Sequence, residues 1–79
     1  MTEREQRLLI ELRDARYWWE HKTYNLESLS GLQHITPTLI AMQRKGWVGD
    51  NRKRGSQRMW HITDAGREAL TAEEARDGR

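Results

Sequence analysis

The residues whose types could do chemistry gather in one segment, residues 33–58. This segment carries six Lys or Arg residues against a single acid, Asp50, whereas the flanking residues 1–32 and 61–79 carry net charges of −1 and −2. A cluster of cations on an otherwise near-neutral chain suits the phosphate backbone of nucleic acid better than a membrane surface, which would call for a basic amphipathic helix. The alternative is an ordinary solvated basic loop.

The segment divides into short polar side chains followed by cations. Short side chains on a helix allow close approach to a major groove, and long cations at its end can reach phosphates. The first group is therefore expected to bind DNA from a recognition helix: Gln33, His34, Thr36, Pro37, Thr38, Ala41, Arg44 and Lys45. The second group is expected to bind the backbone or a narrow minor groove from a β-turn: Arg52, Lys53, Arg54, Ser56 and Arg58. For each residue the alternative is an ordinary solvent-facing position.

Other chemistries find no support in the chain. There is no cysteine, no glycine-rich phosphate loop and no His-Glu-x-x-His motif. The three histidines, His21, His34 and His61, stand far apart in the sequence, and such isolated histidines are more often surface or core residues than zinc ligands. We therefore predict neither an enzyme, nor a cofactor, nor a metal site.

Helix and strand signals position the basic segment. Thr36 is a suitable N-cap and Pro37 a favoured first helical residue, so a helix is predicted from here to Gly46. The spacing of its apolar residues directs one face inward, namely Ile35, Leu39 and Met42. A strand is then predicted from Trp47, with residues 57–62 as its partner and the turn between them. Strand alternation buries Trp60 and Ile62.

Three further helices are predicted around this pair. The first spans residues 3–20, with a capping box from Thr2 to Glu5 and an inward stripe of Leu8, Leu12, Ala15 and Trp19. A short second helix, residues 26–30, would be capped by Asn25 and ended by Gly31, with Leu26 and Leu29 inward. A last helix follows Thr63 as its N-cap, and residues 76–79 should fray.

The outer face of the first predicted helix carries large apolar side chains. Ile10 and Tyr17 lie seven residues apart, and Trp18 lies on the flank. A small domain seldom leaves such a group outward without use, so these three residues form a candidate dimer or partner surface. Scattered surface aromatics are the alternative, and they are common.

Length and composition point to one α+β, mostly helical domain over residues 1–79, with a core of about residues 5–72. No apolar run approaches the roughly 20 residues that a membrane span needs. The N-terminus is polar and unlike a signal peptide, so the expected compartment is the cytoplasm and no membrane is expected as a partner.

Two stretches resemble a known family. Thr-Pro-Thr-Leu-Ile-Ala-Met-Gln-Arg-Lys-Gly-Trp-Val, residues 36–48, resembles the recognition helix and following strand of PadR-like and MarR-like winged-helix regulators. Trp-His-Ile-Thr-Asp-Ala-Gly-Arg-Glu-Ala-Leu, residues 60–70, resembles the segment that closes their wing, and its part from Ile62 onward is the more specific. The resemblance covers residues 26–70 and implies a winged helix-turn-helix: three helices, a two-stranded wing and a C-terminal helix. Small regulators and excisionases of phages and mobile elements look similar.

These features predict a double-stranded-DNA-binding transcriptional regulator, acting as a repressor. The third helix would occupy the major groove while the basic wing holds the backbone, and a homodimer would bind two half-sites. One alternative is an excisionase-like protein that bends DNA. Another, of a different class, is a winged-helix module that binds a host protein.

Overall fold

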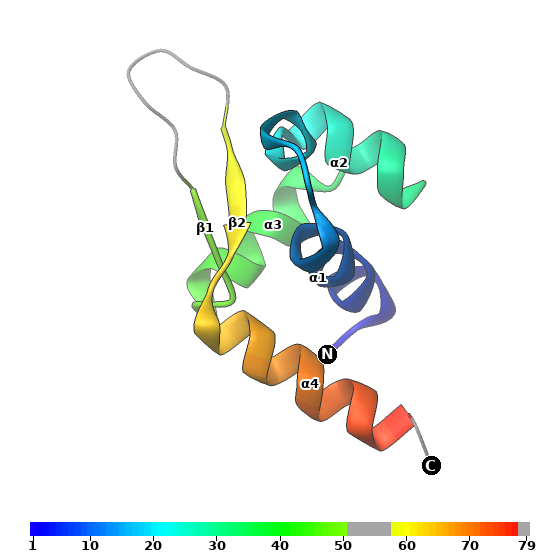
Figure 1. Cartoon of the computed structure of the whole chain (residues 1–79), viewed down its shortest axis with the longest axis vertical. Coiled ribbons are helices and arrows are strands. Elements are labelled where there is room, and N and C mark those ends of the chain that lie inside the picture. The colour runs from blue at the N-terminus through cyan, green and yellow to red at the C-terminus, as the bar shows by residue number, and fades with distance from the viewer. Residues whose placement is uncertain (51–57, 78–79) are drawn as a thin grey trace.

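The computed structural model describes residues 1–50 and 58–77. The chain is α+β and mostly helical. Its elements in order are helix α1 (Glu3–Asp14), the 3-10 helix η1 (Trp18–His21), helix α2 (Thr23–Ser30), helix α3 (Thr36–Arg44), strand β1 (Val48–Asp50), strand β2 (Trp60–Ile62) and helix α4 (Asp64–Asp77). Figure 1 shows α1 at the centre, with α4 below it, α2 above it and the two strands at one side.

The two strands pair in an antiparallel sheet in which Gly49 lies opposite His61. A further bridge joins Lys22 to Met59, just before β2. The indole Nε1 of Trp60 also donates to the Thr23 hydroxyl at 2.8 Å. The segment between α1 and α2 is thus tied to β2, and this positions the sheet against the helices.

The core forms where α1, α3, β2 and α4 meet. As the apolar spacing predicted, Leu8 and Leu12 of α1 are buried and so are Trp60 and Ile62 of β2. Leu70 of α4 is fully buried as well. The remaining core residues are Leu9, Leu26, Ile35, Leu39, Met42 and Val48.

The first helix ends six residues before its predicted end at Glu20. The chain turns extended at Ala15, and the Glu20 carboxylate accepts hydrogen bonds from the backbone N–H groups of Arg16 and Tyr17, both at 2.6 Å. These two hydrogen bonds, first the one from Tyr17 and then the one from Arg16, lower the pKa of Glu20 below its ordinary value. The prediction that Trp19 is inward was therefore wrong: it is 40% exposed and stacks on Tyr17.

The second helix begins earlier than predicted, at Thr23, so Asn25 is not its N-cap. The Asn25 amide instead donates to the Trp19 carbonyl at 2.6 Å. Leu26 is fully buried as predicted, but the prediction for Leu29 was wrong: it is 41% exposed, and Ser30, four residues after Leu26, is buried in its place. Gly31 ends the helix in the left-handed conformation, with φ of 72°, as predicted.

The predicted start of the last helix is confirmed. The Thr63 hydroxyl accepts from the Gly66 backbone N–H at 3.0 Å, two residues after the helix begins at Asp64. The Thr63 N–H itself donates to the Trp47 carbonyl at 3.0 Å, which joins α4 to the start of β1. The helix runs through Arg76 to Asp77, so the fraying predicted from residue 76 is not seen in its described part.

Gly66 is required by this junction. A Cβ at this position would collide with the backbone carbonyl oxygen of Trp47 and would lie 3.0 Å from Ile62 Cγ1. Gly66→Ala is therefore expected to lower the free energy of unfolding by about 1–3 kcal/mol, as overpacking does. In an unobstructed helix the same change would raise it by about 1 kcal/mol. Urea unfolding of the variant decides between the two signs, and a stabilised Gly66→Ala would contradict the close packing.

Candidate nucleic-acid interface

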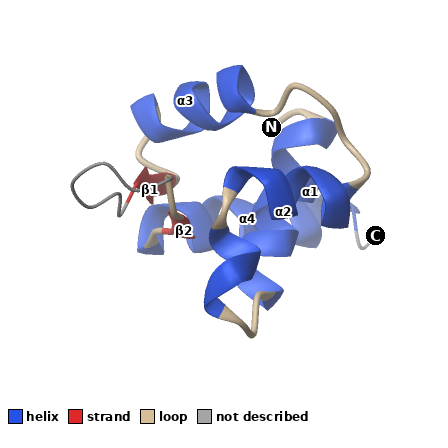
Figure 2. Ribbon diagram, turned by 90° about the horizontal axis from the view of Figure 1, so that it is seen from above, coloured by secondary structure: helices blue, strands red, loops and turns tan. Residues whose placement is uncertain are grey.

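Helix α3 presents one face to the core and the other to solvent. Ile35, Leu39 and Met42 are fully buried, as predicted. The predicted outward residues Gln33, His34, Pro37, Ala41, Arg44 and Lys45 are all exposed, while Thr36 and Thr38 are partly buried at the margins. In Figure 2, α3 runs along the upper side of the molecule, and α2 and α4 lie below it. Pro37, Ala41 and Arg44 are thus exposed on α3, with Gln33 and His34 exposed in the turn before it and Lys45 directly after it.

The start of α3 differs by one residue from the prediction. Ile35, not Thr36, holds the N-cap position, and its backbone is already right-handed, with φ of −80° and ψ of −15°. The Ile35 carbonyl accepts from the Leu39 N–H at 2.9 Å, so Thr36 is the first helical residue. Pro37 still lies in the first turn, where its missing N–H costs nothing.

The turn before α3 is held by an arginine that the sequence did not single out. Arg4 Nη2 donates to the Gln33 carbonyl at 2.8 Å and lies 3.4 Å from the His34 carbonyl. His34 has φ of 54°, an unusual backbone value for a residue other than glycine. Nothing in the spacing could have indicated this contact, because Arg4 precedes Gln33 by 29 residues.

The two cations at the end of α3 are not equivalent. Arg44 is exposed in the last turn. Lys45 lies 2.7 Å from a carboxylate oxygen of Glu5, and its Nζ is 4.7 Å from the centre of the Trp47 ring. Glu5 is buried, with only 4% of its surface exposed. Much of the positive charge of Lys45 is thus already compensated within the protein, which makes Arg44 the stronger candidate for a phosphate contact.

The carboxylate of Glu5 also caps α1, since it accepts from the Thr2 backbone N–H at 2.8 Å. Burial acts to raise the pKa of Glu5, but the hydrogen bonds from Lys45 and Thr2 outweigh burial and lower that pKa below its ordinary value of 4.5. A carboxyl group whose pKa is lower in the folded state stabilises the fold at high pH, and this stabilisation is lost as the pH falls through the folded-state pKa.

Glu5→Gln removes the carboxylate whose pKa is lowered in the folded state. At pH 7 the variant is expected to unfold about 1–2 kcal/mol more easily than the native protein, because a charged hydrogen bond is lost. At the lowest pH at which the protein stays folded the difference should be smaller, since the native carboxylate takes up a proton as the pH falls through its lowered pKa. Urea unfolding at both pH values measures this, with Glu3→Gln, an exposed residue of the same turn, as the control. An equal cost at both pH values would show that the ion pair does not stabilise the fold.

The residues predicted for the wing are only partly described. Arg52, Lys53, Arg54 and Ser56 lie outside the described residues. Arg58 lies next to β2, where its Nε is 3.5 Å from an Asp50 carboxylate oxygen and its guanidinium lies 5.5 Å from the centre of the Trp60 ring. Arg58 therefore packs along the sheet while remaining partly exposed.

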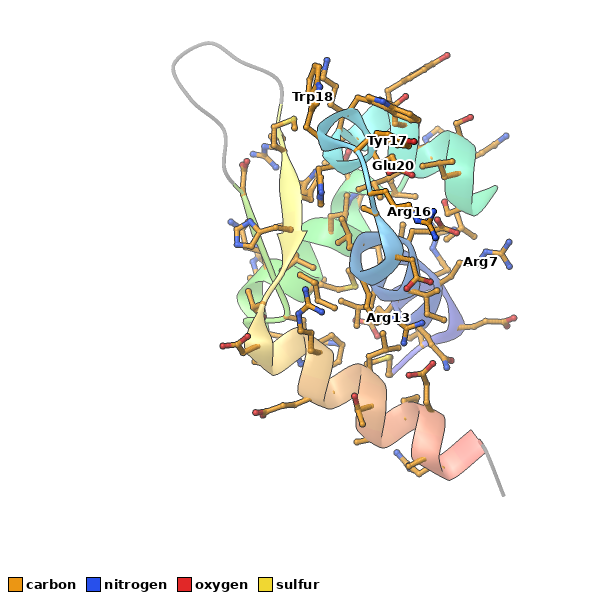
Figure 3. The ribbon with its side chains drawn as sticks, viewed as in Figure 1. Arg7, Arg13, Arg16, Tyr17, Trp18 and Glu20 are labelled. Carbon is orange, nitrogen blue, oxygen red and sulfur yellow. The ribbon has the colours of Figure 1, made fainter. Side chains whose placement is uncertain are left out.

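The candidate partner surface is not a helix face. Ile10 is half-buried on α1 against the core, whereas Tyr17 and Trp18 belong to the connection after α1 ends. Figure 3 shows Tyr17 and Trp18 beside η1, well away from the start of α1. Both aromatics are exposed, Trp18 by 67%, and Lys22 Nζ lies 4.8 Å from the centre of its ring. The predicted surface therefore shifts to Tyr17, Trp18 and Trp19, which we call the aromatic cluster.

The described residues contain neither a group of metal ligands nor a membrane-spanning helix. Within residues 1–50 and 58–77, no three His, Asp or Glu side chains are grouped as metal ligands. No helix in the same part of the chain is both long enough and apolar enough to cross a membrane.

Comparison of the chain with protein-family models, with curated proteins and with solved structures gives no match in any of the three.

Proposed function

We propose that this protein is a winged-helix DNA-binding regulator that acts as a transcriptional repressor. The observation that carries the proposal is the exposed face of α3, where short side chains are followed by Arg44 while the opposite face is fully buried. A helix anchored in this way can enter a major groove without rearranging the core. At nine residues, α3 is about 14 Å long, enough to follow a few base pairs.

In the proposed complex, Gln33, His34 and Thr38 reach base edges and Ala41 lies against a thymine methyl. Arg44 binds a phosphate next to the groove. The basic residues 52–54 and Arg58 act as a wing on the neighbouring backbone, as in the PadR-like and MarR-like regulators that the sequence resembles. Repression follows from occupancy, because DNA covered in this way is closed to polymerase.

Two copies are expected at each specific site. A single module of this size buries only on the order of 600–1,000 Å² on DNA, which supports modest affinity alone. Two copies on half-sites about one helical turn apart would supply the remainder. An excisionase-like protein would instead bind several sites in a row and bend the duplex, so gel mobility of circularly permuted fragments separates the two roles.

The proposal is tested by fluorescence anisotropy of labelled duplex DNA over a salt series. We expect the logarithm of the affinity to fall steeply and linearly with the logarithm of salt concentration. Replacing Arg52, Lys53 and Arg54 together with glutamine should make that slope shallower by about 2–3, since each phosphate contact contributes roughly 0.9.

The matched control replaces three exposed arginines elsewhere, namely Arg7, Arg16 and Arg67. It removes the same charge, so an equal change of slope in both triple variants would mean that only net charge matters. Absence of binding to any duplex at about 50 mM salt would overturn the proposal, because even non-specific binding is measurable there.

A second candidate function is favoured by the aromatic cluster. The aromatic cluster belongs to the segment between α1 and α2, not to α3, and Lys22 joins that segment to Met59 just before β2. Exposed aromatics with a cation over one ring are typical of protein interfaces. A module that binds a protein through this cluster would tolerate the triple wing substitution but not Trp18→Ala, whereas the DNA regulator would show the reverse.

A further inference from the structure

The first turn of α1 contacts α3 at both of its ends. Arg4 donates to the Gln33 and His34 carbonyls just before α3, at 2.8 and 3.4 Å. The next residue, Glu5, lies 2.7 Å from Lys45 Nζ just after α3. Two neighbouring residues of α1 thus contact the two ends of the nine-residue helix α3. Arg4 is 29 positions from Gln33 in the sequence, and Glu5 is 40 positions from Lys45.

The Arg4 contact fixes a turn that would otherwise be free to change. His34 adopts the left-handed backbone conformation, which costs energy for a residue with a Cβ and persists only where surrounding contacts favour it. Both contacts come from one nitrogen, Nη2, whose two hydrogens can be donated to the two adjacent carbonyls at once. Arg4 thereby sets the direction in which the Gln33 and His34 side chains leave the turn.

The Glu5 contact fixes the other end. One carboxylate oxygen of Glu5 accepts from the Thr2 N–H and the other from Lys45, so the carboxylate is held by α1 while it holds α3. Its burial excludes competing water. The Lys45 Nζ also lies 4.7 Å from the centre of the Trp47 ring.

Between these two contacts, α3 packs on the core with apolar side chains. Leu39 and Met42 pack in the cluster that includes Leu8 and Leu9 of α1. Apolar burial is non-directional and tolerates small rotations, whereas hydrogen bonds weaken steeply with angle. The angle of α3 against the body is therefore set by the polar contacts at its ends.

We propose that Arg4 and Glu5 are positioning residues that fix the pose of α3 and so determine how well it distinguishes one DNA sequence from another. This inference rests on the proposed function, because discrimination has meaning only if α3 reads bases. Neither residue belongs to the predicted DNA-reading face. Their effect on DNA passes through Gln33, His34 and Lys45.

The test compares Arg4→Gln with Arg7→Gln. Both arginines are exposed on α1, and Figure 3 shows Arg7 pointing away from the body. A duplex selected by the native protein from a random pool and a scrambled duplex serve as the two probes. We expect Arg4→Gln to lower the ratio of the two affinities by about tenfold, the scale of one lost base contact. Arg7→Gln should leave the ratio unchanged, and Glu5→Gln should lower it when compared with Glu3→Gln.

The salt dependence separates positioning from a direct phosphate contact. If Arg4 bound a phosphate, Arg4→Gln would weaken both duplexes equally and make the salt slope shallower by about 0.9, and Arg4→Lys would restore binding. That result would overturn the proposal. A positioning arginine predicts a changed ratio and the same salt slope as Arg7→Gln.

A second measurement needs no DNA. Residual dipolar couplings of backbone amides report the orientation of α3 relative to α1 and α4. They should change in Arg4→Gln and Glu5→Gln but not in the two control variants, with circular dichroism confirming that each variant is folded. Unchanged couplings would overturn the positioning role even if the native protein binds DNA. If the native protein binds no duplex, the proposed function fails separately, and the couplings alone decide whether Arg4 and Glu5 orient α3.

Discussion

Trp60→Ala is expected to cost about 3–5 kcal/mol of stability, the largest effect of any single substitution considered for this chain. Trp60 is fully buried, and its indole Nε1 donates to Thr23. Its backbone carbonyl lies 2.8 Å from His21 Nδ1, so the residue joins β2 to the segment before α2. A domain of this length is stabilised by only about 4–12 kcal/mol in total. The substitution should therefore remove at least about a quarter of the total stability.

Urea unfolding followed by far-ultraviolet circular dichroism measures this loss. Trp18→Ala removes the same side chain from a site that is 67% exposed, and it should change stability by no more than about 0.5 kcal/mol. Trp60→Phe, which keeps most of the buried volume, should fall between the two. Equal unfolding midpoints for Trp60→Ala and Trp18→Ala would contradict the position of Trp60 in the core.

Ala41→Glu is expected to reduce affinity for duplex DNA about a hundredfold, equivalent to roughly 2.7 kcal/mol. Ala41 is exposed in the middle of α3, so the longer side chain should not disturb the core. In the proposed complex it would place a carboxylate between the helix and the groove, against the negative potential of two phosphate backbones. Both the charge and the added length oppose close approach.

The control for this prediction is Ala72→Glu, which adds the same charge at an exposed position on α4. It should bind duplex DNA within about threefold of the native protein, the change that one added charge causes at a distance. Fluorescence anisotropy at one salt concentration is sufficient for the comparison. Similar losses in both variants would indicate that α3 is not the DNA-binding surface.

Local signals in the sequence were sufficient for much of the fold. Thr63 caps α4 because its hydroxyl needs only a backbone N–H two residues into the helix, and this pattern is visible in the chain itself. The inward face of α3 followed from the spacing of Ile35, Leu39 and Met42. Such features depend on neighbours within one turn of helix, and one sequence is enough to predict them.

The errors at the end of the first helix arose where one local arrangement competes with another. The apolar stripe of α1 continues through Ala15 to Trp19, so periodicity favoured a longer helix. In the structure, the Glu20 carboxylate instead binds the N–H groups of Arg16 and Tyr17, and Trp19 stacks on Tyr17 rather than on the core. A helical pattern cannot show that a side chain will cap the chain in another conformation.

The sequence was enough to predict which residues of the candidate site are exposed. It was not enough to predict the contacts that α1 makes with the two ends of α3. Which side chains of α3 face outward follows from helical geometry. That Lys45 is paired with Glu5, and that Arg4 holds the turn at Gln33, depends on where α1 lies in the folded chain. The first pair is separated by 40 positions and the second by 29, and no rule of helix or strand spacing relates residues so far apart. Lys45, one of the predicted DNA-binding residues, thus also lies 2.7 Å from a carboxylate oxygen of the protein itself.

The unequal burial of the tryptophans has an optical consequence. Trp60 is fully shielded, Trp47 is partly buried, and Trp18 and Trp19 are exposed by 67% and 40%. Because indole emission shifts to longer wavelength in water, native emission should already resemble that of an unfolded chain. Acrylamide should quench much of it at once and leave a shielded fraction from Trp60. A Trp18→Phe, Trp19→Phe variant would convert the intrinsic fluorescence from a signal of the surface into a reporter of the core.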